Sequence, residues 1–352
     1  MRAWEKYFRE VDPYTPGEQP RRKDIIKLNT NENPYPPAPG VARVLAGADP
    51  AQYRKYPDPE ASLLVGAIAE AYGVGKENVF VGVGSDDVLG MAFLSFFNGP
   101  EPVLFPNITY SFYDVWAGLF RIPYETQALD KDFRIVPSDY FRENGGIVIA
   151  NPNAPTGIEL PLSDIEEIVK RNQSSVVIVD EAYVDFGGTS ALPLTEKYEN
   201  LLVVQTFSKS RSMAGMRIGF AMGHPDLIRQ LERVKYSYNS YTMNTPSILA
   251  GTEAVRDRAY FEETVAKIVA TRERTKKELS ALGFSFGDSK TNFIFAKRDG
   301  TDAKKLFSAL KEAGIFVRYF DKPLISDYLR ISIGTDEEMD RLIAFLKEYL
   351  GA

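Results

Sequence analysis

The sequence predicts an α/β protein with a mostly parallel central sheet, helices on both faces of that sheet, and a smaller α+β domain. Between residues 76 and 222, short apolar runs typical of buried strands alternate with amphipathic helical stretches, which is the order of βαβ units. After residue 250 a long helical pattern leads into short strands and further helices. With 352 residues the chain can bury one large core and a second, smaller one.

The N-terminal half predicts an arm followed by the central sheet. Residues 12–59 are dense in Pro and Asn and have little periodicity, so we expect an arm that wraps another surface. A helix-like apolar run covers residues 88–97. The runs that we expect to form the sheet are residues 78–81, 102–105, 147–150, 176–180, 201–206 and 217–222.

The C-terminal part predicts the smaller α+β domain. Its expected helices cover residues 260–282, 302–313 and 336–350. Its expected strands are residues 292–296, 315–317 and 328–333. We therefore expect a large domain over residues 34–249, while residues 1–33 and 250–352 form the arm and the smaller domain.

Composition argues against several classes of function. A formal net charge of -6 and the lack of a long Lys/Arg tract argue against a nucleic-acid partner. The chain has no cysteine, and its one histidine, His224, precedes a proline and is expected in a turn, so we expect no thiolate chemistry, no Ser-His-Asp triad and no metal site. We find neither an N-terminal signal pattern nor an apolar stretch of about 18 residues, and we expect a soluble cytoplasmic protein without a membrane partner.

A lysine follows the predicted strand 201–206. Lys209 comes directly after Ser208, and Arg217 follows a few residues later. A buried parallel strand would deliver Lys209 to the carboxyl edge of the sheet, where open α/β folds bind their ligands. There its amine could form a Schiff base with the aldehyde of pyridoxal phosphate, and Arg217 could hold the phosphate. The alternative is a solvated lysine in a Ser-rich loop.

A carboxylate and a phenol close the predicted strand 176–180. Asp180 ends the apolar run, and Tyr183 follows it in the sequence. If Asp180 paired with the pyridine nitrogen of the cofactor, it would keep that nitrogen protonated and make the ring an electron acceptor. Tyr183 could then donate to the phenolate oxygen of the ring. In the alternative interpretation Asp180 caps the next helix and Tyr183 is half-buried filler.

Two further loops lie at strand ends. Residues 82–87 form a Gly-rich turn before the helical run, and backbone amides there could cradle a phosphate, although Ser85 and Asp86 are also ordinary N-cap residues. Residues 151–157 form a loop of Asn, Pro and Gly after the strand 147–150. This loop either fixes polar groups beside a ligand or is a strand exit with favourable turn chemistry.

These four segments resemble the fold-type I pyridoxal-phosphate aminotransferases, in which an Asn-Pro-Thr-Gly loop, an Asp-x-x-Tyr strand end, a Ser-Lys pair and a downstream Arg occur in this order. The resemblance spans nearly the whole chain, and residues 31–34, 53–57 and 206–215 are similar to the histidinol-phosphate aminotransferases. One position departs from the family pattern. The family usually has an Asn before Pro-Thr-Gly that donates to the cofactor's phenolate oxygen, and this chain has Ala154. Asn153 or Tyr183 would then supply that bond.

The resemblance implies pyridoxal 5′-phosphate as the cofactor and Lys209, Asp180 and Tyr183 as catalytic residues. It also implies that Tyr110 stacks on the pyridine face. The residues that it assigns to the cofactor's phosphate are Gly84, Ser85, Asp86, Ser208 and Arg217, joined by Tyr56 from a second subunit. The contact from Tyr56 implies a homodimer with shared active sites.

For the substrate, the resemblance implies an arginine that clamps the α-carboxylate, and Arg330 matches it by its strand context. Tyr14 and Arg318 are the candidates for binding a phosphate on the substrate, and Asn33 is a further candidate for substrate binding. A solvent-exposed position is the alternative for Arg330, Tyr14 and Arg318.

The implied reaction is transamination of L-histidinol phosphate with 2-oxoglutarate, which yields imidazole acetol phosphate and L-glutamate in histidine biosynthesis. Two related activities stay open at this point: an aromatic amino acid aminotransferase and a pyridoxal-phosphate-dependent threonine-phosphate decarboxylase. Transfer of the amino group to 2-oxoglutarate separates the decarboxylase from the two aminotransferases. A non-enzymatic protein on the same scaffold is disfavoured, because every residue type needed to handle the ring is present.

Overall fold

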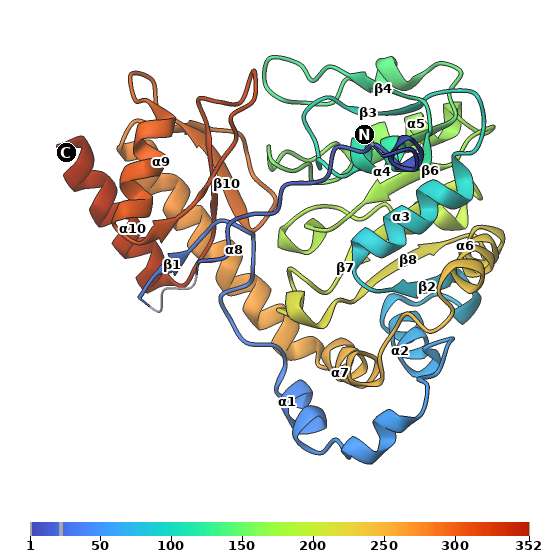
Figure 1. Ribbon diagram of the computed structural model, residues 1–352. Helices are drawn as coiled ribbons and strands as arrows, with labels where there is room; N and C mark the ends of the chain where they lie inside the picture. The colour runs from blue at the N-terminus through green and yellow to red at the C-terminus, as the bar shows by residue number, and fades with distance from the viewer. Residues whose placement is uncertain (1, 21–23, 352) are drawn as a thin grey trace.

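The computed structural model describes residues 2–20 and 24–351, which form a large lobe around a seven-stranded sheet and a smaller lobe beside it (Figure 1). The sheet has the strand order β2-β8-β7-β6-β5-β3-β4. Its strands are β2 (Val79–Gly82), β3 (Val103–Pro106), β4 (Tyr124–Gln127), β5 (Gly146–Ala150), β6 (Val177–Asp180), β7 (Leu201–Thr206) and β8 (Gly219–Gly223). Every predicted strand of this sheet forms, and β4, whose residues are largely exposed, was not predicted.

The sheet is mostly parallel, as predicted, but its strand β8 is reversed. β8 pairs antiparallel with both β7 and β2, whereas β4, β3, β5, β6 and β7 run parallel to one another. The expectation of a uniform βαβ alternation up to residue 222 is therefore wrong at this strand. A parallel strand needs a crossover connection, usually a helix, and the link between β7 and β8 contains only the short 3-10 turn Ala214–Met216.

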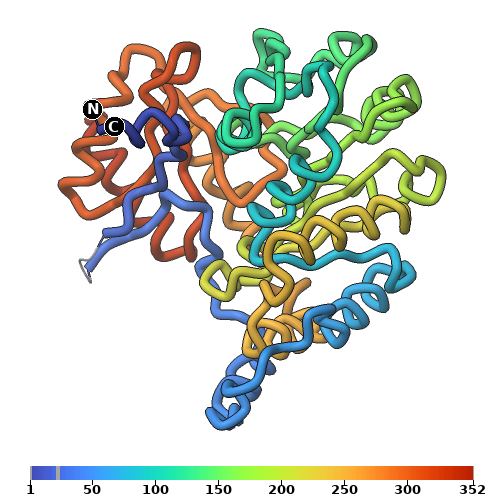
Figure 2. Tube along the Cα trace, turned by 45° about the vertical axis from the view of Figure 1, so that its right-hand side comes forward, coloured from blue at the N-terminus to red at the C-terminus, as the bar shows by residue number. Residues whose placement is uncertain are grey.

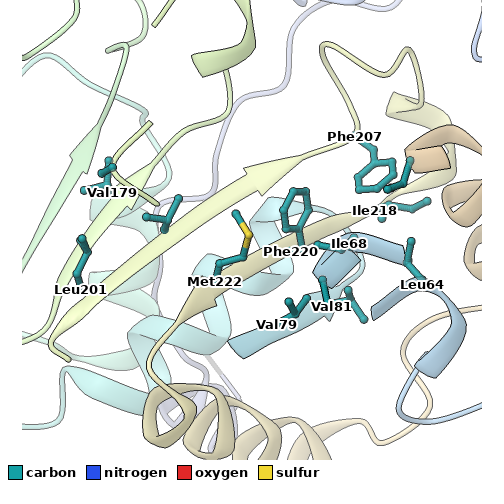
Figure 3. Packing of buried hydrophobic residues seen from close by; sticks show 14 of the residues in the cluster. Leu64, Ile68, Val79, Val81, Val179, Leu201, Phe207, Ile218, Phe220 and Met222 are labelled. Carbon is teal, nitrogen blue, oxygen red and sulfur yellow. The ribbon is translucent and has the colours of Figure 1, made fainter. Parts of the chain in front are cut away.

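Helices cover both faces of the sheet, because its central strands are buried on both sides. One face packs on α2 (Ser62–Tyr72), α5 (Leu162–Arg171) and α7 (Thr245–Arg256), and Figure 3 shows part of this core around Ile68, Phe220 and Met222. The opposite face packs on α3 (Ser85–Phe96), α4 (Tyr113–Phe120) and α6 (Pro225–Tyr238). His224 caps α6 by accepting a hydrogen bond from the amide of Asp226, which confirms its expected position in a turn.

The N-terminal segment has more regular structure than predicted. Its short strand β1 (Ile26–Lys27) pairs in parallel with β11 (Ile315–Phe316), so the arm is tied to the smaller lobe, beside which it runs in Figure 2. Helix α1 (Pro39–Ala46) contacts α7. This helix lacks a sequence signal, since it buries only Gly40 and Val41.

The smaller lobe contains a four-stranded antiparallel sheet with the order β12-β13-β10-β9. Its strands are β9 (Ser285–Phe286), β10 (Phe293–Lys297), β12 (Arg318–Tyr319) and β13 (Leu329–Ser332). The long helix α8 (Arg258–Ala281), α9 (Ala303–Glu312) and α10 (Asp336–Leu350) share one core with this sheet and with β1. The predicted boundary between residues 249 and 250 falls inside α7, which packs in the core of the large lobe. The division of the chain into these two domains stays a prediction.

Across the described residues, no helix is both long and apolar enough to cross a membrane.

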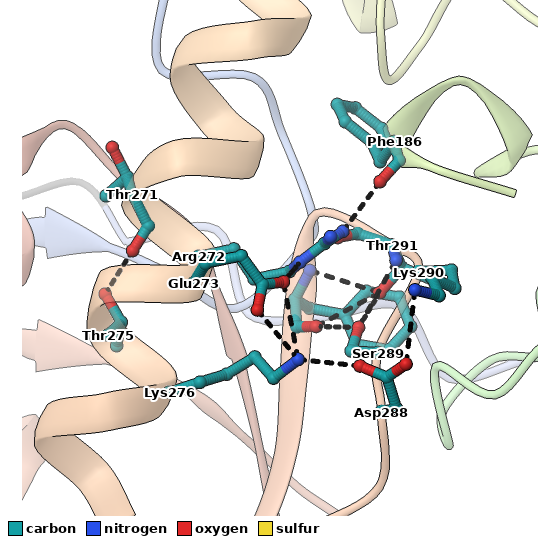
Figure 4. A network of polar contacts seen from close by, with 11 residues as sticks. Phe186, Thr271, Arg272, Glu273, Thr275, Lys276, Asp288, Ser289, Lys290 and Thr291 are labelled. Carbon is teal, nitrogen blue, oxygen red and sulfur yellow. Dashed lines mark hydrogen bonds and ion pairs between the residues drawn. The ribbon is translucent and has the colours of Figure 1, made fainter.

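A buried arginine joins the two lobes. Arg272 of α8 is 3% exposed and donates from one guanidinium nitrogen to the carbonyls of Phe186, at 2.7 Å, and Thr291, at 2.8 Å (Figure 4). Phe186 belongs to the segment that follows β6, so one side chain connects the smaller lobe to the edge of the central sheet. Glu273 accepts from the Nε of Arg272 at 2.9 Å.

We expect Arg272→Met to lower the free energy of unfolding by about 3 kcal/mol, because it leaves two buried carbonyls without their donor, although Glu273 keeps its bond from Lys276. Urea unfolding followed by circular dichroism would measure the change. Arg258→Met is the matched control on the same helix, since its side chain is 83% exposed and, among the described residues, pairs with Glu262 alone. We expect the control to lower the free energy of unfolding by no more than about 0.5 kcal/mol. Equal decreases in both variants would contradict this role of Arg272.

Candidate active site

The carboxyl edge of the central sheet borders a cavity of about 230 Å³. Three parallel strands reach it with their last residues, which are Ala150 of β5, Asp180 of β6 and Thr206 of β7. The remaining lining residues are Thr30, Glu32, Ser85, Asp86, Tyr110, Ala154, Ala182, Tyr183, Ser208, Lys209, Ala214 and Arg217. Most of the residues predicted to bind a cofactor therefore meet in one place.

Lys209 enters the cavity from the turn between β7 and β8. Its Nζ donates to the carbonyl of Thr30 at 3.1 Å and lies 5.8 Å from the centre of the Tyr183 ring. The turn is held from the arm, since the amide of Asn33 donates to the carbonyls of Lys209, at 3.1 Å, and Ser210, at 3.2 Å. The hydroxyl of Ser210 in turn donates to the Asp185 carboxylate. The backbone of Lys209 is thus held from the arm, while its amine faces the cavity.

Asp180 is a buried carboxylate with two fixed donors. The phenol of Tyr113 donates to Oδ2 at 2.8 Å, and the amide of Ala182 donates to Oδ1 at 3.2 Å. Burial raises the pKa of Asp180 to about 6, although both donors and the charge of Lys209 act in the opposite direction. A cationic ring nitrogen placed against this carboxylate would offset the cost of its burial.

Tyr183 is available as a donor into the cavity. Its hydroxyl oxygen accepts from the side-chain amide of Asn31 at 2.8 Å, so its own proton is free to point elsewhere. The backbone of Asn31 lies in the left-handed region at φ 56°. Its amide donates to the hydroxyl of Ser332, and its carbonyl accepts from the side-chain amide of Asn292. Such a conformation is uncommon for a residue other than glycine and is often found at binding sites.

Arg217 and the start of α3 form the opposite end of the cavity. Gly84 has φ 87°, and a Cβ there would lie 2.4 Å from the Arg217 guanidinium, so only a glycine lets Arg217 approach this closely. Arg217 donates to Asp86 at 3.1 Å and to the hydroxyl of Ser208 at 3.4 Å. Tyr110 also donates to Asp86, at 2.7 Å. Arginine, serine hydroxyls and helix-start amides are the groups that bind phosphate in proteins.

A second cavity of about 140 Å³ adjoins the first and shares Thr30, Tyr110, Ala154, Tyr183 and Lys209 with it. It is strongly cationic, because Arg318 and Arg330 both line it and are opposite each other in the pairing of β12 with β13. None of the described residues that line it is a carboxylate.

Arg330 has unused donor capacity. It donates to the carbonyl of Asn29 at 3.0 Å, whereas its buried Nε has no hydrogen-bond partner among the described residues. Burial lowers the pKa of Arg330, with the charge of Arg318 as a further cause. Tyr14 of the arm stacks on Phe112 with ring centres 4.3 Å apart and closes this side of the cavity. A buried guanidinium nitrogen without a partner among the described residues, beside a second arginine, predicts an anionic ligand.

Four predicted residues do not line either cavity: Gly84, Asn153, Asn33 and Tyr56. Asn153 uses its amide in hydrogen bonds with Thr109, at 2.7 Å, and with the carbonyl of Ile108, at 2.9 Å, so of the two candidates to replace the missing Asn only Tyr183 faces the cavity. Asn33 binds the backbone of the lysine turn instead of lying at the substrate cavity. Tyr56 is 81% exposed, stacks on Tyr241 and is absent from the walls of both cavities.

Sequence reasoning missed the side chain of Tyr113 and the backbone of Thr30. Tyr113 lies in a run of aromatic residues that is typical of a core, and the sequence pattern has no signal that its phenol contacts Asp180. Thr30 contributes a carbonyl to Lys209, which any residue type could supply. Asn31 was noticed only as part of the family-like stretch 31–34, although it contacts Tyr183.

The residues present fit pyridoxal phosphate. The first cavity has an amine at Lys209, a buried carboxylate at Asp180 and phosphate-type donors at Arg217 and Ser208. A cationic group lies at each end of the two adjoining cavities. Arg217 lies close against Gly84 at one end, and Arg330 at the other end has a buried Nε without a described partner, so each end can bind an anion.

Comparison with known proteins agrees with this geometry. Residues 23–346 match the family described as Aminotransferase class I and II, and the chain belongs to that family. It is 51% identical to the histidinol-phosphate aminotransferase of Lactococcus lactis subsp. cremoris (strain MG1363) over 99% of this chain and 98% of the relative. It is 52% identical to that of Chromohalobacter salexigens, with 98% of both chains covered. Within the class, the chain is therefore a member of the histidinol-phosphate aminotransferase family.

A solved structure extends the comparison to the fold. The histidinol-phosphate aminotransferase from Sinorhizobium meliloti, determined in complex with pyridoxal-5'-phosphate, superposes with a TM-score of 0.84 at 26% sequence identity. The match covers 93% of this chain and 91% of that one. The L-threonine-O-3-phosphate decarboxylase from Porphyromonas gingivalis has a TM-score of 0.79 at 19% identity and shares the fold.

We expect Asp180→Asn to stabilise the cofactor-free protein by about 2 kcal/mol at pH 8, because it removes the cost of burying a carboxylate. The pKa of Asp180 is raised on folding, from about 4 to about 6, so this cost grows as the pH rises through that interval and is constant above it. The gain should accordingly be much smaller at pH 4.5. Thermal unfolding at both pH values checks this, with Asp299→Asn as an exposed control, and an equal gain at both would contradict it.

Proposed function

We propose that the chain is a pyridoxal-phosphate-dependent aminotransferase that transfers the amino group of L-histidinol phosphate to 2-oxoglutarate in histidine biosynthesis. One observation carries the proposal: Lys209 and the buried Asp180 line one cavity, and the cationic cavity of Arg318 and Arg330 adjoins it. Identity of about half of all residues over the full length of named histidinol-phosphate aminotransferases supports the substrate assignment.

Pyridoxal phosphate, when bound, supplies an electron-accepting ring to which an amine nitrogen is attached covalently. Lys209 would hold the cofactor and, after exchange with the incoming amine, carry the proton between the substrate α-carbon and C4′ of the cofactor. Asp180 would keep the ring nitrogen protonated, and Tyr183 would donate to the phenolate oxygen. Arg217, Ser208 and the amides of Ser85 and Asp86 would bind the phosphate.

The second cavity has the charge that both substrates need. Glutamate presents carboxylates and histidinol phosphate presents a phosphate, while the cavity has two arginines and no described carboxylate in its walls. Arg330 would take the α-carboxylate of glutamate, and Arg318 with Tyr14 would take the phosphate of the other substrate. An outer cavity of about 460 Å³, which shares Tyr14 and Arg318 with the second, offers room for the bulkier substrate.

The first test is a half-reaction. We expect L-histidinol phosphate and L-glutamate each to convert the bound cofactor to its amino form, and 2-oxoglutarate to reverse the change, which the visible absorption spectrum would follow. Lys209→Ala should abolish borohydride-dependent attachment of the cofactor, measured by mass spectrometry. Conversion by L-phenylalanine alone, or carbon dioxide release from L-threonine phosphate, would instead support a related activity.

We further propose a homodimer in which Tyr56 completes the partner's phosphate site. Tyr56 and Tyr241 stack 4.6 Å apart while 81% and 45% exposed. Tyr53, Tyr236 and Tyr238 on neighbouring segments are also exposed, and a group of bare aromatic side chains is typical of a protein interface. A cytoplasmic location stays a prediction from the sequence.

Hybrid dimers distinguish a shared site from independent sites. We expect Tyr56→Phe homodimers to bind the cofactor about tenfold more weakly, because a hydrogen bond to a charged phosphate is lost. A hybrid of one Tyr56→Phe subunit with one Lys209→Ala subunit should regain normal affinity and activity at its single working site. Tyr241→Phe serves as the control for the aromatic stack, and a hybrid without recovery would contradict the shared site.

A further inference from the structure

Tyr113 contacts the buried carboxylate beside the first cavity. We propose that Tyr113 is a positioning residue, which keeps Asp180 ionised and fixed in the orientation that pairs with the ring nitrogen of the cofactor. This inference rests on the proposed function, since it concerns a group that only the cofactor brings.

The geometry places one donor on each oxygen of Asp180. Tyr113 is 0% exposed and is the first residue of α4, and its phenol donates to Oδ2 at 2.8 Å. The amide of Ala182 donates to Oδ1 at 3.2 Å. Two donors from different elements set the plane of the carboxylate, and each oxygen keeps a lone pair for a further partner. Asp180 lines the cavity, so a ring nitrogen there can reach it.

Packing alone does not require the hydroxyl of Tyr113. Its ring lies 5.7 Å from Phe105, 6.3 Å from Phe93 and 6.3 Å from Trp116, and a phenylalanine would fill the same space. A buried hydroxyl is costly unless it is hydrogen-bonded. Tyr140 offers the comparison: it is 1% exposed in the core on the other face of the sheet, and its hydroxyl has no partner within the part of the chain described.

The phenol of Tyr113 opposes the rise in the pKa of Asp180 that burial causes. Burial, the main cause, and the charge of Asp86 raise the pKa of Asp180, while Tyr113, Ala182 and Lys209 lower it. Burial and Asp180 together raise the pKa of Tyr113 well above its usual value, so the phenol stays protonated and donates to the ionised carboxylate, which can only accept. A neutral donor stabilises the carboxylate without adding a charge that would repel the pyridinium.

One short segment therefore serves two carboxylates. Tyr110 and Tyr113 have ring centres 5.7 Å apart at 84° to each other, and Tyr110 donates to Asp86 as Tyr113 donates to Asp180. The two acids lie at opposite functional ends of the cavity, one beside Arg217 and the other at the end of β6. The end of the loop after β3 and the first residue of α4 thus position the two carboxylates together.

The test compares two ligands of the cofactor-free protein by calorimetry. The first is pyridoxal phosphate, and the second is its deaza analogue, which has C–H in place of the ring nitrogen. We expect Tyr113→Phe to weaken binding of pyridoxal phosphate about tenfold or more, and binding of the analogue less than about twofold. Tyr140→Phe, the matched control, should change neither affinity.

A second background isolates the role of Asp180. In an Asp180→Asn protein, Tyr113→Phe should cause no further loss of pyridoxal phosphate affinity, because the group it acts through no longer ionises. Equal weakening of both ligands, or the same loss in the Asp180→Asn background, would overturn the proposal.

Two controls keep the outcomes separate. If Tyr113→Phe does not fold, 3-fluorotyrosine at position 113 is the second variant, because it keeps the ring and the hydroxyl donor. If Tyr113 acts as a donor, this variant should bind pyridoxal phosphate no more weakly than the natural protein. A natural protein that fails to attach pyridoxal phosphate to Lys209 would overturn the proposed function. Normal attachment with an unaffected Tyr113→Phe variant would overturn only this inference.

Discussion

The carboxyl edge of the central sheet is the constraint on which the site depends. β5, β6 and β7 run parallel and end there at Ala150, Asp180 and Thr206, as ligand-binding edges of α/β sheets do. The reversal of β8 adds to this edge, because its register pairs Gly219 with Thr206. Both ends of the link between the two strands therefore lie at the same edge. Lys209 and Arg217 belong to that link, so one antiparallel return delivers an amine and a phosphate-type donor to one cavity.

Buried charge is the energetic cost of this arrangement. Asp180, Glu181 and Asp185 follow one another closely at the end of β6, and burial raises the pKa of each. Each has its own donors: Tyr113 for Asp180, Ser190 and Gln205 for Glu181, and Ser210 for Asp185. Because Ser210, the donor to Asp185, adjoins Lys209, the Asp185 carboxylate also fixes the position of the lysine turn. Hydrogen bonds inside the fold hold these carboxylates in place. Apolar packing alone is not directional and could not orient them.

The sequence predicted those parts of the fold and site that depend on strong local patterns. Apolar runs located every strand of the central sheet except β4, whose exposed residues make no such run. Lys209, Asp180 and Arg217 were identified as candidates because Asp180 ends a buried strand, Lys209 follows another, and the order and spacing of the three residues are those of a known family. The reversal of β8, the contact of Asn33 with the lysine turn and the bond from Tyr113 to Asp180 were not found. They depend on which segments meet in space, and a side chain such as the Asn33 amide has the same local signal whether it binds a ligand or a backbone carbonyl.

The walls of the second cavity, which we propose as the substrate site, come from both lobes and the arm. Tyr14 and Asn29 come from the arm, Tyr110 and Lys209 from the large lobe, and Arg318 and Arg330 from the smaller lobe. An anion bound between the two arginines is also within the walls formed by the other segments, so binding energy can stabilise the relative position of the lobes. The buried Nε of Arg330 has no partner among the described residues, so it is already desolvated in the folded protein. Binding of an anion therefore does not have to remove water from this nitrogen. In the proposed function, this preformed cationic cavity beside the amine of Lys209 would accept a carboxylate and a phosphate in turn, as two successive half-reactions at one site require.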